Sequence, residues 1–322
     1  MSSAGHRIDR ARLFAGDRIA IARAISVVEN ESEGAPALLA DVYARTGRAY
    51  RIGVTGPPGA GKSTITNKLA FHYRRQGLSV GIIAVDPTSP FTGGALLGDR
   101  VRMTDVDLDA GVFIRSMASR GSLGGLSKKA VEAADILDAS GKEVILMETV
   151  GVGQSELDIA GAADTTVVVL VPESGDSIQA MKAGLMEIAD FFVLNKADRA
   201  GADQAVLSIQ MILHFRSAGA WTAEVVKAVA NEGTGIPEIA ATVARHRDFL
   251  ERSGGLAARR RRRLEGRIRE LIDDRLNVGF WTAERARLLT EKLESALLRR
   301  STPYDVAREL VEDFTRGERN GV

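Results

Sequence analysis

The fold follows from residues 50–64, Tyr-Arg-Ile-Gly-Val-Thr-Gly-Pro-Pro-Gly-Ala-Gly-Lys-Ser-Thr. They predict a short apolar strand over Tyr50 to Thr55, then a glycine-rich turn, then a helix that begins near Gly61. The turn fits G-x-x-x-x-G-K-[ST], and the strand–loop–helix context is the one that this phosphate-binding loop (P-loop) requires. Glycine is needed because the backbone wraps closely around phosphate oxygens, which a Cβ would block. The freed N–H groups and the helix N-terminus form an anion site.

The P-loop predicts a nucleotide site with defined roles. Lys62 is expected to reach the outer phosphates and to neutralise charge during phosphoryl transfer, and the Ser63 hydroxyl is expected to ligate Mg²⁺. The predicted phosphate contacts are Gly59, Ala60, Gly61, Lys62, Ser63 and Thr64.

Bulk composition excludes several classes of function. The 322 residues are 45% apolar and 26% charged, with a net charge of +1, which is typical of a globular protein and favours neither nucleic acid nor membrane as a partner. There is no cysteine, and the four histidines are scattered, which excludes disulfides and thiolate metal sites. No apolar run approaches the roughly 20 residues of a membrane span, and residues 1–15 lack the apolar core of a signal peptide. We therefore expect a cytoplasmic protein, or the processed form of an organellar one.

Between residues 50 and about 250, apolar runs alternate with helical stretches. The runs are 51–55, 79–85, 112–114, 144–147, 165–171, 191–194 and 224–228. Uninterrupted apolar strands separated by helices are typical of a buried, mostly parallel sheet. We therefore expect an α/β domain of the P-loop NTPase class over residues 49–250, with ligands at the carboxyl ends of the strands.

Both ends of the chain are predicted to be helical. Residues 1–48 have apolar residues at helical spacing, with a break at 31–36, and are interpreted as an extension of two helices. Residues 251–322 carry apolar stripes at helical spacing and are interpreted as a C-terminal helical dimerisation arm; packing on the chain's own core is the alternative. The five arginines at 259–263 are expected on a solvated helix face, and binding of nucleic acid is the less favoured alternative. The last helix is expected to begin after Ser301 or Thr302.

The motif Asn195-Lys196-Ala197-Asp198 follows the strand predicted at 191–194 and matches the N-K-x-D guanine signature. Guanine presents N1–H and an exocyclic N2–H₂ side by side, so the Asp198 carboxylate can accept both, whereas adenine has no such donor pair. Asn195 is expected to brace the loop, and the stem of Lys196 to lie along the base. Ala230 begins a segment at the place of a further base-contacting loop. The motif predicts GTP or GDP as the bound nucleotide, in preference to ATP.

Three acidic residues are candidates for the magnesium site. Glu148-Thr149-Val150-Gly151 follows a predicted strand and occupies the place of the D-x-x-G element, where an acidic side chain organises Mg²⁺. Asp86 ends the second predicted strand, and Asp86 and Asp99 are the other acids best placed to join the metal shell. The predicted ligands are therefore Ser63, Asp86, Asp99 and Glu148.

Val152 stands where Ras-like enzymes use a glutamine to orient the attacking water. Valine cannot hydrogen-bond water. We therefore expect slow intrinsic hydrolysis, or a water held by Gln154 or by a partner's side chain.

Four longer segments carry a resemblance to a known family. They are D-P-T-S-P-F-T-G-G-A-L-L-G-D-R-x-R-M at 86–103, R-S-M-A-S-R-G-S-L-G-G at 115–125, M-E-T-V-G-V-G-Q-S-E at 147–156 and E-I-A-D-x-x-V-x-N-K-A-D at 187–198. The chain resembles the MeaB/ArgK family, whose human relative is the methylmalonic aciduria type A protein, over nearly its whole length. Members of that family are GTPases that chaperone adenosylcobalamin-dependent acyl-CoA mutases.

The resemblance implies further roles. Asp86, Asp99 and Glu148 match the family's magnesium-linked acids, and 86–103 and 148–156 would be its switches I and II. Residues 173–185 would be the third switch. The candidate catalytic residues are then Lys62, Glu148, Gln154 and Lys182. The third switch reads E-S-G-D at 173–176, which is closer to the G-domain of fused isobutyryl-CoA mutases than to the P-G-x-G-D of methylmalonyl-CoA mutase chaperones, so the client mutase is not identified.

These observations lead to one main hypothesis. The hypothesis is that the chain is a homodimeric, GTP-hydrolysing chaperone that gates cofactor loading and protects an adenosylcobalamin-dependent acyl-CoA mutase. It would act through a two-state switch whose loops are held by the γ-phosphate and Mg²⁺. A metallochaperone GTPase for nickel-enzyme assembly is an alternative that would need His or Cys ligands. A small-molecule kinase would need an acceptor pocket and a general base, and a non-hydrolysing assembly protein is the remaining alternative.

Overall fold

The computed structural model describes residues 8–87, 109–119, 128–149, 155–174, 183–214 and 221–319. The chain divides into two compact units, residues 1–259 and 260–322. The larger unit contains the sheet, and the smaller unit is helical.

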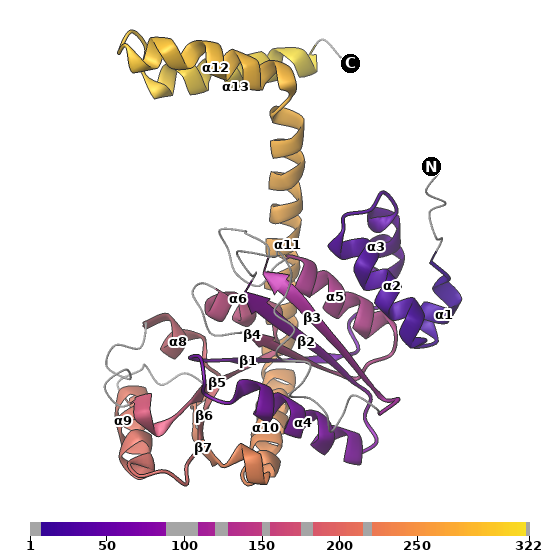
Figure 1. Ribbon diagram of the computed structural model, residues 1–322, viewed down its shortest axis with the longest axis vertical. Helices are drawn as coiled ribbons and strands as arrows, with labels where there is room; N and C mark the ends of the chain where they lie inside the picture. The colour runs from indigo at the N-terminus through magenta and orange to yellow at the C-terminus, as the bar shows by residue number, and fades with distance from the viewer. Residues whose placement is uncertain are drawn as a thin grey trace. The chain divides into compact units, whose positions relative to one another are not determined.

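A seven-stranded sheet forms the centre of the larger unit (Figure 1). Its strands are β1 (Tyr50–Thr55), β2 (Val80–Pro87), β3 (Val112–Ser119), β4 (Val144–Thr149), β5 (Thr165–Leu170), β6 (Phe191–Asn195) and β7 (Val225–Ala228). Their spatial order is β3-β2-β4-β1-β5-β6-β7, and every pairing is parallel. The predicted α/β fold of the P-loop class is therefore confirmed.

One predicted strand was too short. The apolar run ends at Ile114, but β3 continues to Ser119 and pairs with all of β2. β3 lies at the edge of the sheet, where polar residues such as Arg115 and Ser116 are tolerated, so the apolar pattern marked only its first half.

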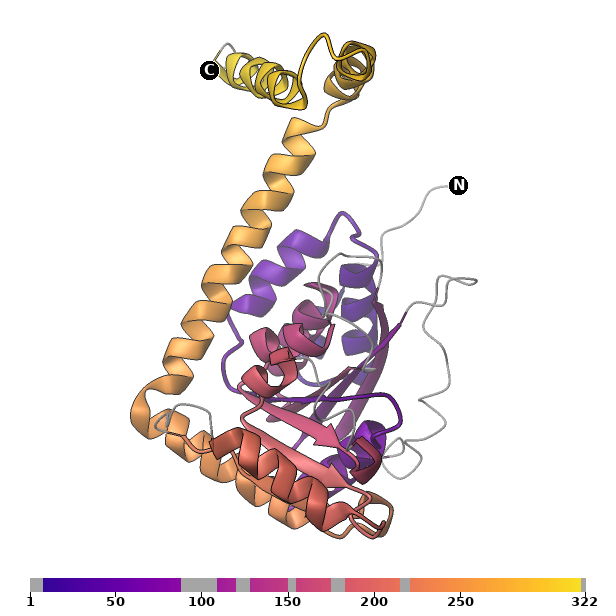
Figure 2. The same cartoon turned by 90° about the vertical axis from the view of Figure 1, so that its left-hand side faces the viewer.

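Helices cover both faces of the sheet (Figures 1 and 2). One face carries α4 (Lys62–Arg75) and α10 (Ile236–Ser253). The other carries α5 (Lys128–Ala139), α6 (Ser155–Ala162), α8 (Ala183–Ile188) and α9 (Ala202–His214), and the short 3₁₀ helices η2 (Pro172–Ser174) and η3 (Ala230–Glu232) follow β5 and β7.

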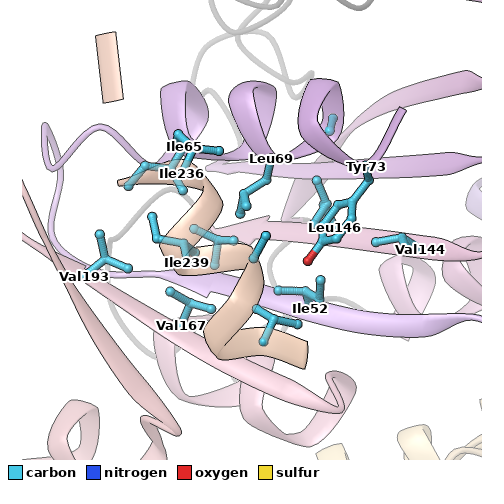
Figure 3. Close-up of a cluster of buried hydrophobic side chains, with 14 of the residues drawn as sticks. Ile52, Ile65, Leu69, Tyr73, Val144, Leu146, Val167, Val193, Ile236 and Ile239 are labelled. Carbon is cyan, nitrogen blue, oxygen red and sulfur yellow. The ribbon is translucent and has the colours of Figure 1, made fainter. Parts of the chain in front are cut away.

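Alternate residues of each strand enter different cores because successive side chains point to opposite faces. Ile52, Leu146 and Val167 pack with Leu69 of α4 and Ile239 of α10 (Figure 3). Neighbouring strand residues pack against α5 and α6, or against α8 and α9, on the other face. The sheet is therefore buried on both sides and holds the carboxyl ends of its strands rigidly.

The N-terminal extension contains three helices rather than the predicted two: α1 (Arg10–Phe14), α2 (Arg18–Glu29) and α3 (Ala35–Tyr43). The additional break lies at Gly16, whose φ of 82° is left-handed, and at Asp17, whose carboxylate caps α2 by accepting from the Ala20 N–H at 2.8 Å. The extension packs on α5 through a buried apolar cluster and is part of the larger unit.

Arg259 corrects the interpretation of the arginine run. Its guanidinium donates to both carboxylate oxygens of Asp190, at 2.8 and 2.6 Å, and to the Asp164 carbonyl at 3.0 Å. Arg261 and Arg262 are exposed. The solvated-face hypothesis is therefore wrong for Arg259, which belongs to the larger unit.

The smaller unit consists of most of α11 (Gly255–Phe280) together with α12 (Ala283–Leu297) and α13 (Pro303–Arg319). α12 and α13 pack on each other, and the rings of Phe280 and Phe314 lie 5.4 Å apart. Thr302 precedes α13 and exchanges hydrogen bonds with Asp305, which confirms Thr302 as the cap. No helix in the described ranges is both long enough and apolar enough to cross a membrane.

Candidate nucleotide-binding site

The P-loop leaves the carboxyl end of β1, between β4 and β5. Two glycines of the loop are required because neighbouring atoms of the protein leave no room for a Cβ. A Cβ on Gly56 would lie 2.1 Å from the Val169 carbonyl oxygen, and one on Gly61 would lie 2.3 Å from the Asn195 side-chain nitrogen. Both residues also have positive φ, 136° and 89°. The loop can therefore follow this path only with glycine at these positions.

Three side chains hold the carbonyl groups of the P-loop. The Lys62 ammonium donates to the Gly56 and Pro57 oxygens at 2.8 and 2.9 Å. The Lys196 ammonium donates to the Gly59 oxygen at 2.9 Å, and the Asn195 amide donates to the Ala60 oxygen at 2.8 Å. The loop is thus held in a wrapped conformation by contacts within the chain, which is the preorganisation that an anion site needs.

The N-K-A-D motif begins at the last residue of β6. Asn195 is 3% exposed, and its side-chain oxygen accepts from the Ala230 N–H at 3.1 Å. Asn195 therefore joins three loops, because its other side-chain atom contacts the P-loop. Asp198, in contrast, is exposed. The Asp198 carboxylate is therefore accessible to a nucleobase, while Asn195 and Lys196 of the same motif are held in place by the P-loop.

These loops surround a cleft of about 300 Å³. The residues that line it are Gly59, Gly61, Thr64, Asn195, Lys196, Asp198, Arg199, Val229, Ala230, Asn231 and Glu232. The tertiary structure therefore brings together the P-loop residues and the predicted base-contacting residues, which lie more than 130 positions apart in the sequence.

The predicted metal ligands Ser63 and Glu148 are in contact. The Ser63 hydroxyl donates to Glu148 Oε1 at 2.5 Å, and Glu148 is 4% exposed. Asp86 is in β2, one residue beyond the pairing of Val85 with Thr149, so its backbone lies at the same end of the sheet. A hydroxyl and a carboxylate held together are the hard oxygen donors that Mg²⁺ prefers, so the residues present fit this ion.

Several predicted residues lie outside the described part of the chain. They are Asp99, Gln154 and Lys182, together with Val152. The backbone of Asp86 is described, but its side chain is not.

Four residues that line the cleft were not among the predicted contacts: Arg199, Val229, Asn231 and Glu232. Arg199 also forms an ion pair with Glu173 of η2. Their places in the sequence could have indicated them, because Arg199 directly follows Asp198, and Asn231 and Glu232 directly follow Ala230.

Comparison with known proteins identifies a family of GTPases. The model of the family described as "Methylmalonyl Co-A mutase-associated GTPase MeaB" matches residues 21–285. GTPase ArgK of Escherichia coli is 39% identical, with 76% of this chain and 77% of that protein covered. The mitochondrial methylmalonic aciduria type A homolog of Mus musculus is 35% identical, with 84% of this chain and 70% of that protein covered.

A solved structure is similar over almost the full length. The crystal structure of a LAO/AO transport system kinase superposes with a TM-score of 0.73 at 30% identity, and covers 98% of this chain and 99% of the other. The similarity therefore includes both helical ends as well as the sheet.

Proposed function

Because this chain belongs to the MeaB family of methylmalonyl-CoA mutase-associated GTPases, we propose that its GTPase activity controls an adenosylcobalamin-dependent acyl-CoA mutase. In this proposal, the bound nucleotide, GTP or GDP, determines whether the cofactor is loaded into the mutase, and the GTPase protects the mutase. The family match supports the mutase as the partner. The contact of Asn195 with both Ala60 and Ala230 supports the nucleotide site, since it joins the P-loop and the loop that follows β7 around one cleft. The protein would act in the cytoplasm as a homodimer.

Each part of the cleft has a proposed role in binding. The segment 59–64 binds the phosphates of GTP or GDP through backbone N–H groups and Lys62. Asp198 accepts two hydrogen bonds from guanine, Lys196 covers the base with its stem, and Asn195 and Ala230 set the distance between base and phosphates.

Hydrolysis of GTP to GDP and phosphate requires charge stabilisation on the transferred phosphoryl group. Lys62 would leave the carbonyls of Gly56 and Pro57 to contact the phosphates. Ser63 and Glu148, with Asp86 and Asp99, would hold Mg²⁺, which when bound neutralises charge on the phosphate oxygens. Gln154 and Lys182 remain proposed catalytic residues.

A nucleotide-specificity switch tests the base site. Guanine donates two hydrogen bonds to the Asp198 carboxylate, from N1–H and from the amino group at C2. Xanthine has a carbonyl at C2 instead, so its N1–H and C2 carbonyl match the oxygen and the NH₂ of an asparagine side chain. We expect Asp198→Asn to lower kcat/KM for GTP by at least about 100-fold and to gain activity with XTP. Lys62→Ala should lose activity with both nucleotides. Equal use of ATP and GTP by the wild type would contradict the assignment.

The partner is tested by measuring phosphate release from GTP with and without each candidate mutase in its holo and apo forms. We expect slow turnover by the chain alone and acceleration by one mutase. Unchanged turnover with every mutase would refute the chaperone proposal. Recovery of the γ-phosphate on a small molecule instead of as inorganic phosphate would favour the kinase alternative.

A further inference from the structure

The guanine loop, residues 195–199, is fixed at several points. Its first residues are tied to the P-loop through the side chains of Asn195 and Lys196. Its middle is tied to β7 by the Ala197 N–H, which donates to the Ala228 oxygen at 3.0 Å. At its far end, Arg199 forms an ion pair with Glu173 of η2, which lies just beyond the end of β5. The ion pair therefore connects the base site to the segment that follows a different strand.

The loop contains a conformation that needs support. Lys196 has a φ of 58°, which is left-handed and unfavourable for a residue with a Cβ. The Arg199 N–H donates to the Lys196 oxygen at 3.1 Å and closes a turn over this residue. Strained backbone persists where surrounding contacts hold it. The side chain of Arg199 is one of these contacts, since Glu173 anchors the residue that closes the turn.

The electrostatics of the ion pair agree with this arrangement. The Arg199 guanidinium, the backbone N–H of Glu173 and the nearby Lys196 together hold the pKa of the Glu173 carboxyl below its usual range. The two side chains are half-exposed, at 50% for Arg199 and 52% for Glu173. An ion pair at this exposure is sensitive to salt.

We propose that the Glu173–Arg199 ion pair is a latch that slows the release of guanine nucleotide. Arg199 lines the cleft beside Asp198, so a loosened Arg199 frees the end of the loop that carries the base-binding carboxylate. Glu173 acts through Arg199 and is a positioning residue. The inference rests on the guanine site proposed above.

The test measures dissociation of a fluorescent GDP analogue by stopped flow, at about 0.05 M and about 0.5 M KCl. The variants are Glu173→Gln, Arg199→Gln and the charge exchange Glu173→Arg with Arg199→Glu. The matched control is Lys227→Gln, which breaks the neighbouring exposed pair Lys227–Asp203 outside the cleft. Thermal unfolding of each variant confirms that the fold is retained.

We expect each single variant to speed release about two- to fivefold at low salt, the range of one exposed ion pair. High salt should speed release from the wild type and remove the difference. The charge exchange should restore slow release, and the control should behave as the wild type does. Wild-type rates in both single variants, or a difference that persists at high salt without rescue by the exchange, would overturn the latch.

Asp198→Asn separates the two proposals. If it weakens GDP binding while the Glu173 and Arg199 variants release at the wild-type rate, the latch alone is wrong. If Asp198→Asn leaves GDP affinity unchanged, the guanine site is wrong, and the latch is wrong with it.

Discussion

Gly61 is one of the residues at which the P-loop and the guanine loop pack closely, beside the contacts of Gly59 with Lys196 and of Ala60 with Asn195. Gly61 is the N-cap of α4 and has a left-handed φ of 89°, and a Cβ at this position would point at the Asn195 side-chain nitrogen. The Asn195 amide donates to the Ala60 oxygen. A side chain at position 61 would displace this amide and so change the distance between the P-loop and the guanine loop. A consensus pattern alone would explain this glycine by the phosphate, whereas here a protein side chain also requires it.

Gly61→Ala tests this contact. The new Cβ would lie 2.3 Å from the Asn195 nitrogen, and the left-handed backbone would add strain of about 1–2 kcal/mol. We expect loss of stability in urea unfolding together with at least tenfold weaker GDP binding by calorimetry, because 1.4 kcal/mol corresponds to about a factor of ten.

Gly266→Ala in α11 is the control, because it is the same substitution in a helix at a position with no steric conflict. Nothing lies within 4 Å of a Cβ at this position, so alanine should be neutral or stabilising by up to about 1 kcal/mol. GDP affinity in Gly61→Ala equal to that of Gly266→Ala would show that the contact with Asn195 does not matter.

At the scale of elements, α10 is attached to the sheet through His246. This residue is fully buried, and its Nδ1 lies 2.8 Å from the Thr165 hydroxyl, which in turn lies 2.6 Å from the Tyr50 hydroxyl. Its Nε2 lies 3.3 Å from Asp190. Burial lowers the pKa of His246; Asp190 opposes this shift, and Arg259 adds to it.

The lowered pKa predicts a pH dependence of stability. The unfolded chain takes up a proton at His246 near pH 6.5, whereas the folded chain does so only at lower pH. The unfolded state then binds more protons, so the stability present above about pH 6.5 is lost as pH falls through the folded pKa, by at most about 1.4 kcal/mol per pH unit. Urea unfolding between pH 7 and pH 5 measures this slope.

His246→Gln should flatten the slope, although it also lowers stability at every pH by removing buried packing. The exposed His214 is the control residue, and His214→Gln should keep the wild-type slope. A slope in His246→Gln equal to that of the wild type would assign the pH dependence to other groups.

At the scale of the whole molecule, the smaller unit carries an apolar surface on α11. Ile268, Leu271, Ile272 and Leu276 are between 42% and 52% exposed and recur at helical spacing. Apolar stripes of this kind mark protein–protein contacts. They support the proposed homodimer through this unit.

Leu271→Lys with Ile272→Lys tests the dimer. Two charges in an apolar interface carry a desolvation cost that the contact cannot recover, so we expect a monomer by light scattering at micromolar concentration, with the circular dichroism of the wild type. Ile19→Lys, an exposed apolar position on α2 of the larger unit at 57% exposure, is the control and should leave the mass unchanged. A wild type that is already monomeric would refute the arm assignment.

Much of the architecture was predictable because its signals are local. The P-loop pattern, the buried apolar strands and the N-K-A-D motif each occupy a few consecutive residues, and strand ends in a parallel sheet must meet at one edge. The length of β3 and the break at Gly16 were missed because edge strands tolerate polar residues and a single turn interrupts the apolar spacing only briefly.

The sequence by itself determined the fold class and the residues proposed to bind a guanine nucleotide, since strand, loop and helix follow from short-range periodicity and steric requirements. Only the tertiary structure decided which residues meet. Asn195 contacts Ala60 across 135 positions, and Arg259 contacts Asp190 across 69. Arg199 contacts Glu173 across 26. Such pairs depend on where the sheet places the ends of distant segments, and no local pattern carries that information.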